Sequence, residues 1–264
     1  MKKPLITLLT DFGTRDHYVA SMKGVILQIN PMCTLVDITH EVGPQDIREG
    51  AFLLANAYAY FPKGTIHLSV VDPGVGSPRK PMLLVTQNHF FVGPDNGLLS
   101  IAARRDGVRK AITLNNPKFF LSRVCATFHG RDIFAPVAAH LSLGVRPSLL
   151  GRKIDTWVEL DVGKVKRTGD ELVGEIVHVD SFGNLISNID EDRLRRFAKR
   201  QALTIRIGKR VIKALKRGYW EGKRSEPMAL LGSGGFLEVS VREGSAQKSL
   251  KVERGHPILI RRGH

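Results

Sequence analysis

The alternation of short apolar runs with helical patterns in the first half of the chain constrains its fold most strongly. Ile6–Thr10 is a continuous apolar run of the kind found in buried parallel strands, and a polar turn follows it at 11–16. Apolar residues then recur at helical spacing from Tyr18 to Ile29, and Asn30-Pro31 ends that helix. Further strands are expected at 34–39, 66–71, 82–86 and 90–92, with a helix from Asp46 to about Tyr60 that begins in a capping box with Glu49. This β-α-β-α-β order predicts an α/β domain with a mostly parallel sheet flanked by helices.

The pattern changes near residue 156, where short strand-like runs alternate with glycine-rich turns. The expected strands are 173–179, 203–207, 211–214, 228–231, 236–241 and 250–253, with one helix near 191–200. Several short strands at this spacing indicate a small antiparallel barrel or sandwich. We therefore expect an N-terminal domain at 1–155 and a smaller C-terminal β domain at 156–264.

The charge of the chain raises the question of a polyanionic partner. The 40 Lys and Arg residues exceed the 25 Asp and Glu residues, which gives a formal net charge of +15, and the stretch 193–224 is particularly basic. Such a stretch could attract nucleic acid or an anionic surface, or it could be a solvated face. The solvated face is favoured, because Tyr219 and Trp220 are the only aromatic side chains beside the patch after Phe197.

The expected compartment follows from the cysteines and from the apolar runs. Only Cys33 and Cys125 are present, which argues against a disulfide scaffold and favours a reducing, cytoplasmic setting. No stretch approaches the roughly 20 apolar residues that a membrane span needs. We expect a soluble cytoplasmic protein that has no membrane partner.

Two acids follow expected strands of the α/β half. Asp11 comes after Ile6–Thr10, and Asp72 comes after the strand at 66–71. Ligands of open α/β sheets bind beyond the carboxyl ends of the strands, so both acids are candidate site residues. A single such acid is usually a helix cap or a turn residue, and that alternative stays open for each.

Arg79 and His129 are the basic candidates. The loop at 74–76 lacks a third glycine for a dinucleotide fingerprint and lacks the Gly-Lys-Ser/Thr of a P-loop. A loop of this kind suits the placement of Arg79 near Asp72, where a fixed cation would keep the carboxylate ionised. His129 precedes an expected helix, and alone it could equally be a structural hydrogen-bonding group. No histidine pair has metal-ligand spacing, and no G-x-S-x-G nucleophile elbow is present, so we expect neither a metal nor a serine hydrolase.

The turn at 179–185 is the candidate of the second half. Asp180 and Asn184 offer polar recognition, and Phe182 offers a flat face for a heteroaromatic ring. The alternative is a hairpin turn in which the Gly-Asn pair only sets the backbone geometry.

Together these segments give the chain a family likeness that runs nearly from end to end. The segments are Leu9–Gly13, Thr39–Val42, Gln45–Ala51, Val71–Gly76 with Arg79, Gly93–Gly97, Phe128–Asp132, Asp180–Asn184 and Ser233–Glu238. In these motifs and their order the chain resembles the S-adenosyl-L-methionine hydrolases (adenosine-forming), relatives of the fluorinase and chlorinase enzymes. The resemblance implies an N-terminal α/β domain, a C-terminal β-barrel, and a homotrimer with active sites between the N-terminal domain of one subunit and the C-terminal domain of the next.

The resemblance also implies a reaction and a set of roles. S-adenosylmethionine and water would give adenosine and methionine, with no cofactor. The implied roles are catalysis for Asp72, Arg79 and His129; ribose binding for Asp11; methionine contacts for Asp16, Asp180 and Ser233; and adenine contacts for Phe182 and Asn184. Two positions depart from the halogenating relatives: Gln45 replaces a tryptophan of the fluorinase, and glycine rather than arginine follows Ser233.

Two rival functions follow from the same residues. A halogenase would attack the same carbon with halide, but halogenating relatives carry tyrosine where Asp72 stands and lack the histidine, and a carboxylate there would repel halide. The other rival is a nucleic-acid-binding protein that uses the stretch 193–224 and retains only a vestigial pocket. Hydrolysis is favoured, and nucleic acid is not expected as a partner.

Overall fold

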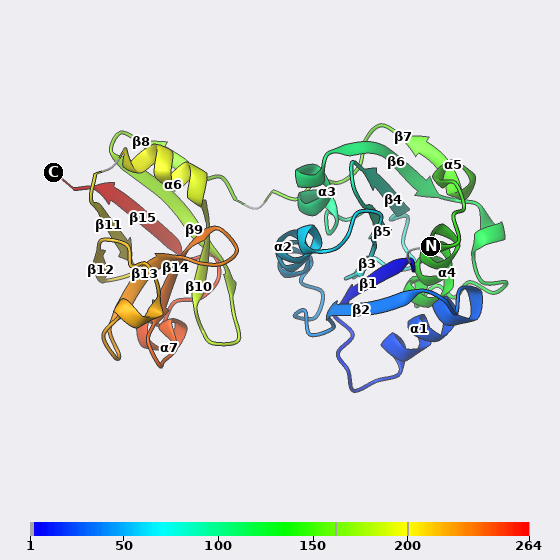
Figure 1. Cartoon of the computed structure of the whole chain (residues 1–264), viewed down its shortest axis with the longest axis horizontal. Helices are drawn as coiled ribbons and strands as arrows, with labels where there is room; N and C mark the ends of the chain where they lie inside the picture. Colours follow the sequence, from blue (N-terminus) through cyan, green and yellow to red (C-terminus); the bar gives the residue numbers. More distant parts are fainter. Residues whose placement is uncertain (1–2, 162, 200, 264) are drawn as a thin grey trace. The chain divides into compact units, whose positions relative to one another are not determined.

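The computed structural model describes residues 3–161, 163–199 and 201–263 of the chain. It divides into two compact units, Met1–Leu160 and Asp161–His264, which are described separately (Figure 1).

The first unit is an α/β unit built on a seven-stranded sheet. Its strands are β1 (Leu5–Thr10), β2 (Thr34–Thr39), β3 (Ile66–Val70), β4 (Pro81–Thr86), β5 (Phe90–Pro94), β6 (Val108–Leu114) and β7 (Gly151–Ile154). Its main helices are α1 (Tyr18–Ile29), α2 (Ile47–Ala57), α3 (Ser100–Asp106), α4 (Ala135–Ser142) and α5 (Pro147–Leu150). The shorter helical turns are η1 (Tyr58–Tyr60), η2 (Pro117–Phe119) and the π-helical η3 (Gly130–Phe134).

The sheet order is β2-β1-β3-β5-β4-β6-β7, and the sheet is mixed. Strands β2, β1, β3 and β5 pair in parallel, whereas β4, β6 and β7 join in antiparallel fashion. The antiparallel part has a direct cause, because only residues 87–89 connect β4 to β5, and so short a connection cannot return a strand in parallel. The α/β class expected from the sequence is confirmed.

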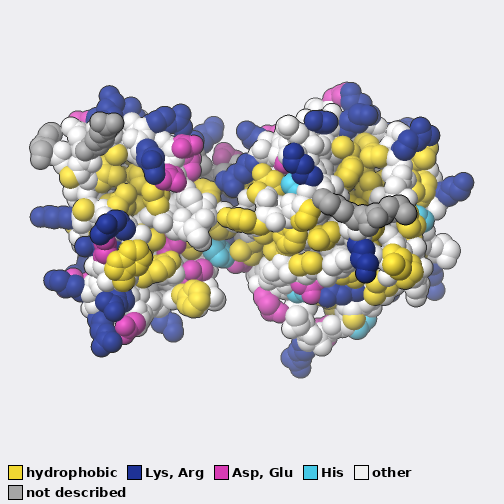
Figure 2. Space-filling view, viewed as in Figure 1, with side chains coloured by type: hydrophobic (Ala, Val, Ile, Leu, Met, Phe, Trp, Pro, Cys, Tyr) yellow, Lys and Arg dark blue, Asp and Glu magenta, His cyan; other side chains and the backbone are white. Residues whose placement is uncertain are grey.

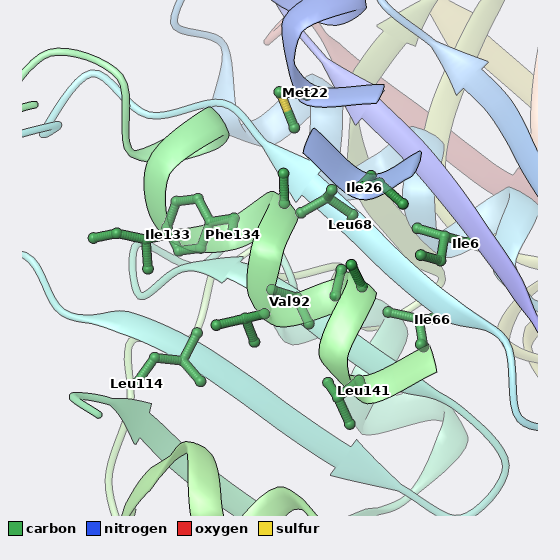
Figure 3. Close-up of a cluster of buried hydrophobic side chains, with 14 of the residues drawn as sticks. Ile6, Met22, Ile26, Ile66, Leu68, Val92, Leu114, Ile133, Phe134 and Leu141 are labelled. Carbon is green, nitrogen blue, oxygen red and sulfur yellow. The ribbon is translucent and has the colours of Figure 1, made fainter. Parts of the chain in front are cut away.

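Helices cover both faces of this sheet and bury its apolar side chains. Helices α1 and α4 close one core together with the Ile6, Leu68 and Val92 side chains (Figure 3). Helices α2 and α3 close a second core on the other face, around Leu9 and Phe91. Because packed helices cover both faces of the sheet, the carboxyl edge of the parallel strands is where this unit can bind a ligand.

The second unit is a β structure that nearly closes into a barrel. Its strands are β8 (Lys166–Thr168), β9 (Glu171–Val179), β10 (Leu185–Asp190), β11 (Leu203–Ile207), β12 (Arg210–Lys213), β13 (Pro227–Leu231), β14 (Phe236–Val241) and β15 (Pro257–Arg262). Their order is β12-β11-β15-β9-β10-β14-β13, with β8 beside β9, and every pair is antiparallel. The edge strands β12 and β13 contact each other, and the interior is a single apolar core. Helices α6 (Glu191–Ala198) and α7 (Ala246–Leu250) and the turn η4 (Tyr219–Glu221) complete the unit.

Most of the expected elements are present, and a few are not. The strands at 34–39, 203–207 and 236–241 have the expected bounds, and Asp46 caps α2 by accepting a hydrogen bond from the backbone N–H of Glu49. The helix expected at 191–200 is α6, although Arg200 lies outside the described residues. The strand expected at 250–253 is wrong. Ser245 caps a short helix there, which ends at Lys251 in the left-handed conformation.

Candidate active site

The two strand-end acids of the first unit lie at one edge of the sheet. β1 and β3 are parallel neighbours, and Thr10 lies opposite Val70, so Asp11 and Asp72 leave the sheet side by side. The negative charge of Asp11 contributes to the raised pKa of Asp72, as expected for two nearby carboxylates. The carboxyl edge therefore gathers acids at the position where open α/β sheets bind their ligands.

Asp72, Arg79 and His129 form one connected group at this edge. Nε of Arg79 donates to Oδ1 of Asp72 at 3.1 Å, and Nη2 of Arg79 donates to Oδ2 of the same carboxylate. Nη2 also lies 3.0 Å from Nδ1 of His129. The side chains of Asp72 and Arg79 are only 5% and 7% exposed, so the ion pair is well shielded from water. The structure brings together the trio that the sequence suggested.

The surroundings shift the pKa values of both titratable members. Burial raises the pKa of Asp72 and outweighs the opposing attraction of Arg79. Burial and the positive charge of Arg79 lower the pKa of His129. The site therefore holds a carboxylate that is a stronger base than an exposed aspartate and an imidazole that is neutral at pH 7.

The loop that carries Arg79 packs directly against the segment before His129. Gly76 has a φ of +78°, and a Cβ added there would lie 2.4 Å from the carbonyl oxygen of Ala126. Only glycine fits so close an approach in this conformation. At the base of the loop, the side-chain amide of Asn96 donates to the carbonyl of Val71 at 2.8 Å.

His129 immediately precedes the π-helical turn η3. The turn runs into α4, and its buried Phe134 lies beneath the guanidinium of Arg79, with Cζ 5.4 Å from the ring centroid. Single π turns inside helices are often found at functional sites, because the extra residue re-aims the side chains beside it. The Phe134 ring thus stabilises the position of Arg79, in addition to the hydrogen bonds within the trio.

Asp11 is fixed by a donor that sequence reasoning did not assign. The backbone N–H of Gln45 donates to Oδ2 of Asp11 at 2.8 Å, and Gln45 has a φ of +64°. A left-handed residue of this type gives no local sequence signal, since Gly, Asn or Asp usually fill such positions. Asp16 lies exposed in the loop before α1, and within the described part of the chain no hydrogen bond or ion pair joins it to the trio.

The candidate residues of the second unit lie on two hairpin turns. The Asp180 carboxylate accepts hydrogen bonds from the backbone N–H of Phe182 and from the backbone and side chain of Asn184, at 3.0, 2.9 and 2.8 Å. This turn leaves the Phe182 ring 77% exposed, while Asn184 is buried. Ser233 is exposed in the turn between β13 and β14. Asp180 thus has a structural role in its turn, as the hairpin alternative predicted, and the same turn presents a free aromatic face.

Five Lys and Arg side chains of the basic stretch 193–224 form ion pairs within the described residues. The pairs are Arg193 with Asp190, Arg195 with Glu191, Arg217 with Glu221, Lys223 with Glu226, and Arg224 with Glu243. On the face shown in Figure 2, Lys and Arg side chains are also scattered over both units rather than gathered on one of them. These pairs support the solvated-face hypothesis over a dedicated polyanion site.

The described residues contain neither a helix that could span a membrane nor a cluster of metal-ligating side chains. Across 3–161, 163–199 and 201–263, no helix has the length and apolar content needed to cross a membrane. Within the same ranges, no group of three or more His, Cys, Asp or Glu side chains could hold a metal ion.

The fold and the Asp72–Arg79–His129 trio define a two-unit protein, an α/β unit and a β-barrel unit, with an enzyme-like site on the α/β sheet edge. Residues 6–151 match the N-terminal domain of the SAM hydroxide adenosyltransferases, and residues 174–259 match their C-terminal domain. The chain belongs to this family.

Named proteins that are similar in sequence to this chain are consistent with this family assignment. An (R)-S-adenosyl-L-methionine hydrolase of Thermus thermophilus is 37% identical over 262 residues, which covers 97% of this chain and 98% of the relative. A fluorinase of an Actinoplanes species is 28% identical over 220 residues, covering 73% of this chain and 74% of the relative. The crystal structure of a conserved protein from Thermotoga maritima, 37% identical, superimposes with a TM-score of 0.91 and covers 97% of this chain and 100% of that one.

Proposed function

We propose that this chain hydrolyses S-adenosylmethionine to adenosine and methionine, with Asp72 as the group that activates water. The observation that carries the proposal is the shielded Asp72–Arg79–His129 group at the carboxyl edge of the sheet, beside Asp11. The likeness to the hydrolase of Thermus thermophilus supports the same reaction.

The hydrogen bonds of the trio favour Asp72 over His129 as proton acceptor. A guanidinium only donates hydrogen bonds, so Nδ1 of His129 accepts from Nη2 of Arg79. A neutral imidazole that accepts at Nδ1 carries its proton on Nε2, and this Nε2–H can only donate. His129 can therefore orient a water or hydroxide oxygen, whereas the lone pairs that take up a proton belong to Asp72.

The proposed reaction balances without any cofactor. The water oxygen forms a bond to the ribose C5′, and the C5′–S bond breaks with its electron pair going to sulfur, which leaves as the neutral thioether of methionine. The water proton passes to Asp72 and then to solvent. The sulfonium is already a good leaving group, so the main task of the protein is to hold an activated oxygen in line with the C5′–S bond.

The remaining candidate residues are proposed as substrate contacts. Asp11, pinned by the backbone of Gln45, suits the ribose hydroxyls as an acceptor. The exposed ring of Phe182 suits stacking with adenine, with Asn184 beside it. Asp16, Asp180 and Ser233 are proposed for the methionine portion, where acids attract the substrate ammonium.

Halide transfer is the nearest competing reaction, and the charge at position 72 opposes it. A shielded carboxylate at the position of the nucleophile repels halide, while it favours a water that it can deprotonate. Incubation of the purified protein with S-adenosylmethionine, with and without chloride, followed by chromatography of the products, separates the two. We expect adenosine and methionine in both cases; 5′-chloro-5′-deoxyadenosine as the main product would overturn the proposal.

The trio is tested by substitution. Asp72→Asn keeps the shape of the side chain but removes its charge, and we expect a loss of turnover on the order of 10²-fold or more with substrate binding retained. His129→Ala is expected to behave similarly. Asp155→Asn, at a side chain that is 87% exposed, is the matched control. Wild-type turnover in both trio variants would remove these residues from the mechanism.

The oligomeric state and the cellular compartment of the protein are also proposed. We propose a homotrimer, as the family resemblance implies, which light scattering of the purified protein tests. Cys33 and Cys125 are both free thiols, in keeping with the reducing cytoplasm where we place the protein. Cell fractionation tests that assignment.

A further inference from the structure

The β-barrel unit contains a buried carboxylate that has no cationic partner within the described residues. Glu238, in β14, is only 5% exposed. Its Oε1 accepts hydrogen bonds from the Tyr219 hydroxyl at 2.8 Å and from the Ser240 hydroxyl at 2.5 Å. Among the described residues, no Lys, Arg or His forms an ion pair with Glu238, and both of these hydrogen bonds go to the same oxygen, Oε1. A buried carboxylate is costly to hold unless a positive charge or further donors compensate it, so this one is a candidate for receiving a cation.

Glu238 lies between the two turns that carry the substrate-contact candidates of this unit. In the sheet it is opposite Ile186 of β10 on one side and Leu230 of β13 on the other. It also lies directly beneath the turn of Ser233, because a Cβ added to the neighbouring Gly232 would be 2.4 Å from Oε2 of Glu238. The carboxylate is therefore in contact with the backbone that presents Ser233.

Tyr219 is hydrogen-bonded to this carboxylate and also lies within the electrostatic influence of Asp180. Burial, the hydrogen bond to Glu238, and the negative charges of Glu238 and Asp180 together raise the pKa of Tyr219 to about 12. The Tyr219 hydroxyl thus stays protonated and lies in the field of two carboxylates. It donates its only proton to Glu238, so the lone pairs of its oxygen remain free to accept. The residue is 46% exposed, which leaves its side chain open to a ligand.

We propose that Glu238, acting with Tyr219, is a specificity-determining element that recognises the positive charge of S-adenosylmethionine. This inference rests on the proposed function. The substrate carries a sulfonium and an ammonium, and a buried carboxylate that forms no ion pair among the described residues favours such a ligand over a neutral one. Asp180 already accepts three hydrogen bonds within its own turn, so fewer of its lone pairs are open to a ligand, and Glu238 adds a second carboxylate to this region. The element selects the sulfonium substrate against S-adenosylhomocysteine, which has the same adenosine and amino-acid groups but a neutral sulfur.

The test compares the affinities of the two ligands by calorimetry. Asp72→Asn, expected to be inactive, serves as the parent so that the substrate is not consumed, and Glu238→Gln or Tyr219→Phe is added to it. Glutamine retains an acceptor for Tyr219 and Ser240 but removes the charge. We expect Glu238→Gln to weaken S-adenosylmethionine binding by about tenfold to a hundredfold, the range of a hydrogen-bonded charge. S-adenosylhomocysteine binding is expected to fall by a much smaller factor, and Tyr219→Phe should change the same ratio less.

The ratio of the two affinities separates this role from a purely structural one. A residue that only supports the fold would weaken both ligands equally, and that result, or an unchanged ratio, would overturn the inference. Glu226→Gln removes the same charge from an exposed position of the same unit and should leave the ratio unchanged. If Glu238→Gln fails to fold, Tyr219→Phe carries the test, because it removes a single hydroxyl from a partly exposed side chain. Turnover by the unmodified protein is measured separately, so a failure of the hydrolase proposal is distinguishable from a failure of this one.

Discussion

His67 gives the clearest quantitative prediction for the stability of this protein. It lies on β3, fully buried, with Nδ1 2.8 Å from the Thr7 hydroxyl and its ring stacked on Phe91 at 5.0 Å. Nε2 is buried and has no hydrogen-bond partner among the described residues. Burial, reinforced by the nearby His89, lowers the pKa of His67 from 6.5 to about 3. The imidazole is therefore neutral in the folded protein throughout the physiological range.

The sign of the pH effect follows from proton binding. Between pH 6.5 and about 3 the unfolded chain binds a proton at this residue and the folded protein does not, so acid favours unfolding. The stability that the neutral buried form contributes is complete above pH 6.5 and is lost progressively as the pH falls through that window. With about 1.4 kcal/mol per pKa unit, the drop from pH 7 to pH 5 costs about 2 kcal/mol at this residue alone.

Urea unfolding at pH 7 and pH 5, compared between the wild-type protein and His67→Gln, measures this contribution. Glutamine does not titrate, so the variant should lose about 2 kcal/mol less of its free energy of unfolding over the same interval. Contributions from other groups are shared by both proteins and cancel in the difference. His17→Gln, at an exposed position, should behave like the wild type. Equal losses in the wild type and His67→Gln would refute the reasoning.

Two further predictions concern the site. Because burial raises the pKa of Asp72, turnover should fall on the acid side with an apparent pKa above the ordinary 3.8 of an aspartate. The lowered pKa of His129 keeps that residue neutral over the same range. A pH–rate profile checks this, and full activity retained down to pH 3.8 would contradict it. Gly76→Ala should reduce turnover at least tenfold, because the added methyl group forces the loop between Asp72 and Arg79 away from Ala126. The control is Gly64→Ala: Gly64 is also left-handed, but an added Cβ there would have nothing within 4 Å, so this variant should lose stability without that loss of turnover. Equal activity in the two variants would show that the loop contact is unimportant.

Local sequence patterns determined most of the fold and part of the site. Apolar runs and helical spacing depend on neighbours a few residues away, so β1, α1, β2 and the start of α2 were predictable with nearly correct bounds. Asp11 and Asp72 were predictable as a pair for the same reason, because parallel neighbouring strands end at one edge. The strand expected at 250–253 failed because a serine cap and a left-handed residue outweighed a weak apolar pattern.

Only the tertiary structure decided how the charged groups of the site are arranged. Arg79 and His129 are 50 residues apart in the chain, and their 3.0 Å contact fixes which imidazole nitrogen accepts and which donates. The burial of Glu238, with no counter-ion in the part of the chain that the structure describes, is likewise invisible in the sequence, where it is a single charged residue within a strand. Periodicity reports which face of an element is apolar, whereas pKa values and proton positions depend on which distant groups meet in the folded protein and on how much water they exclude.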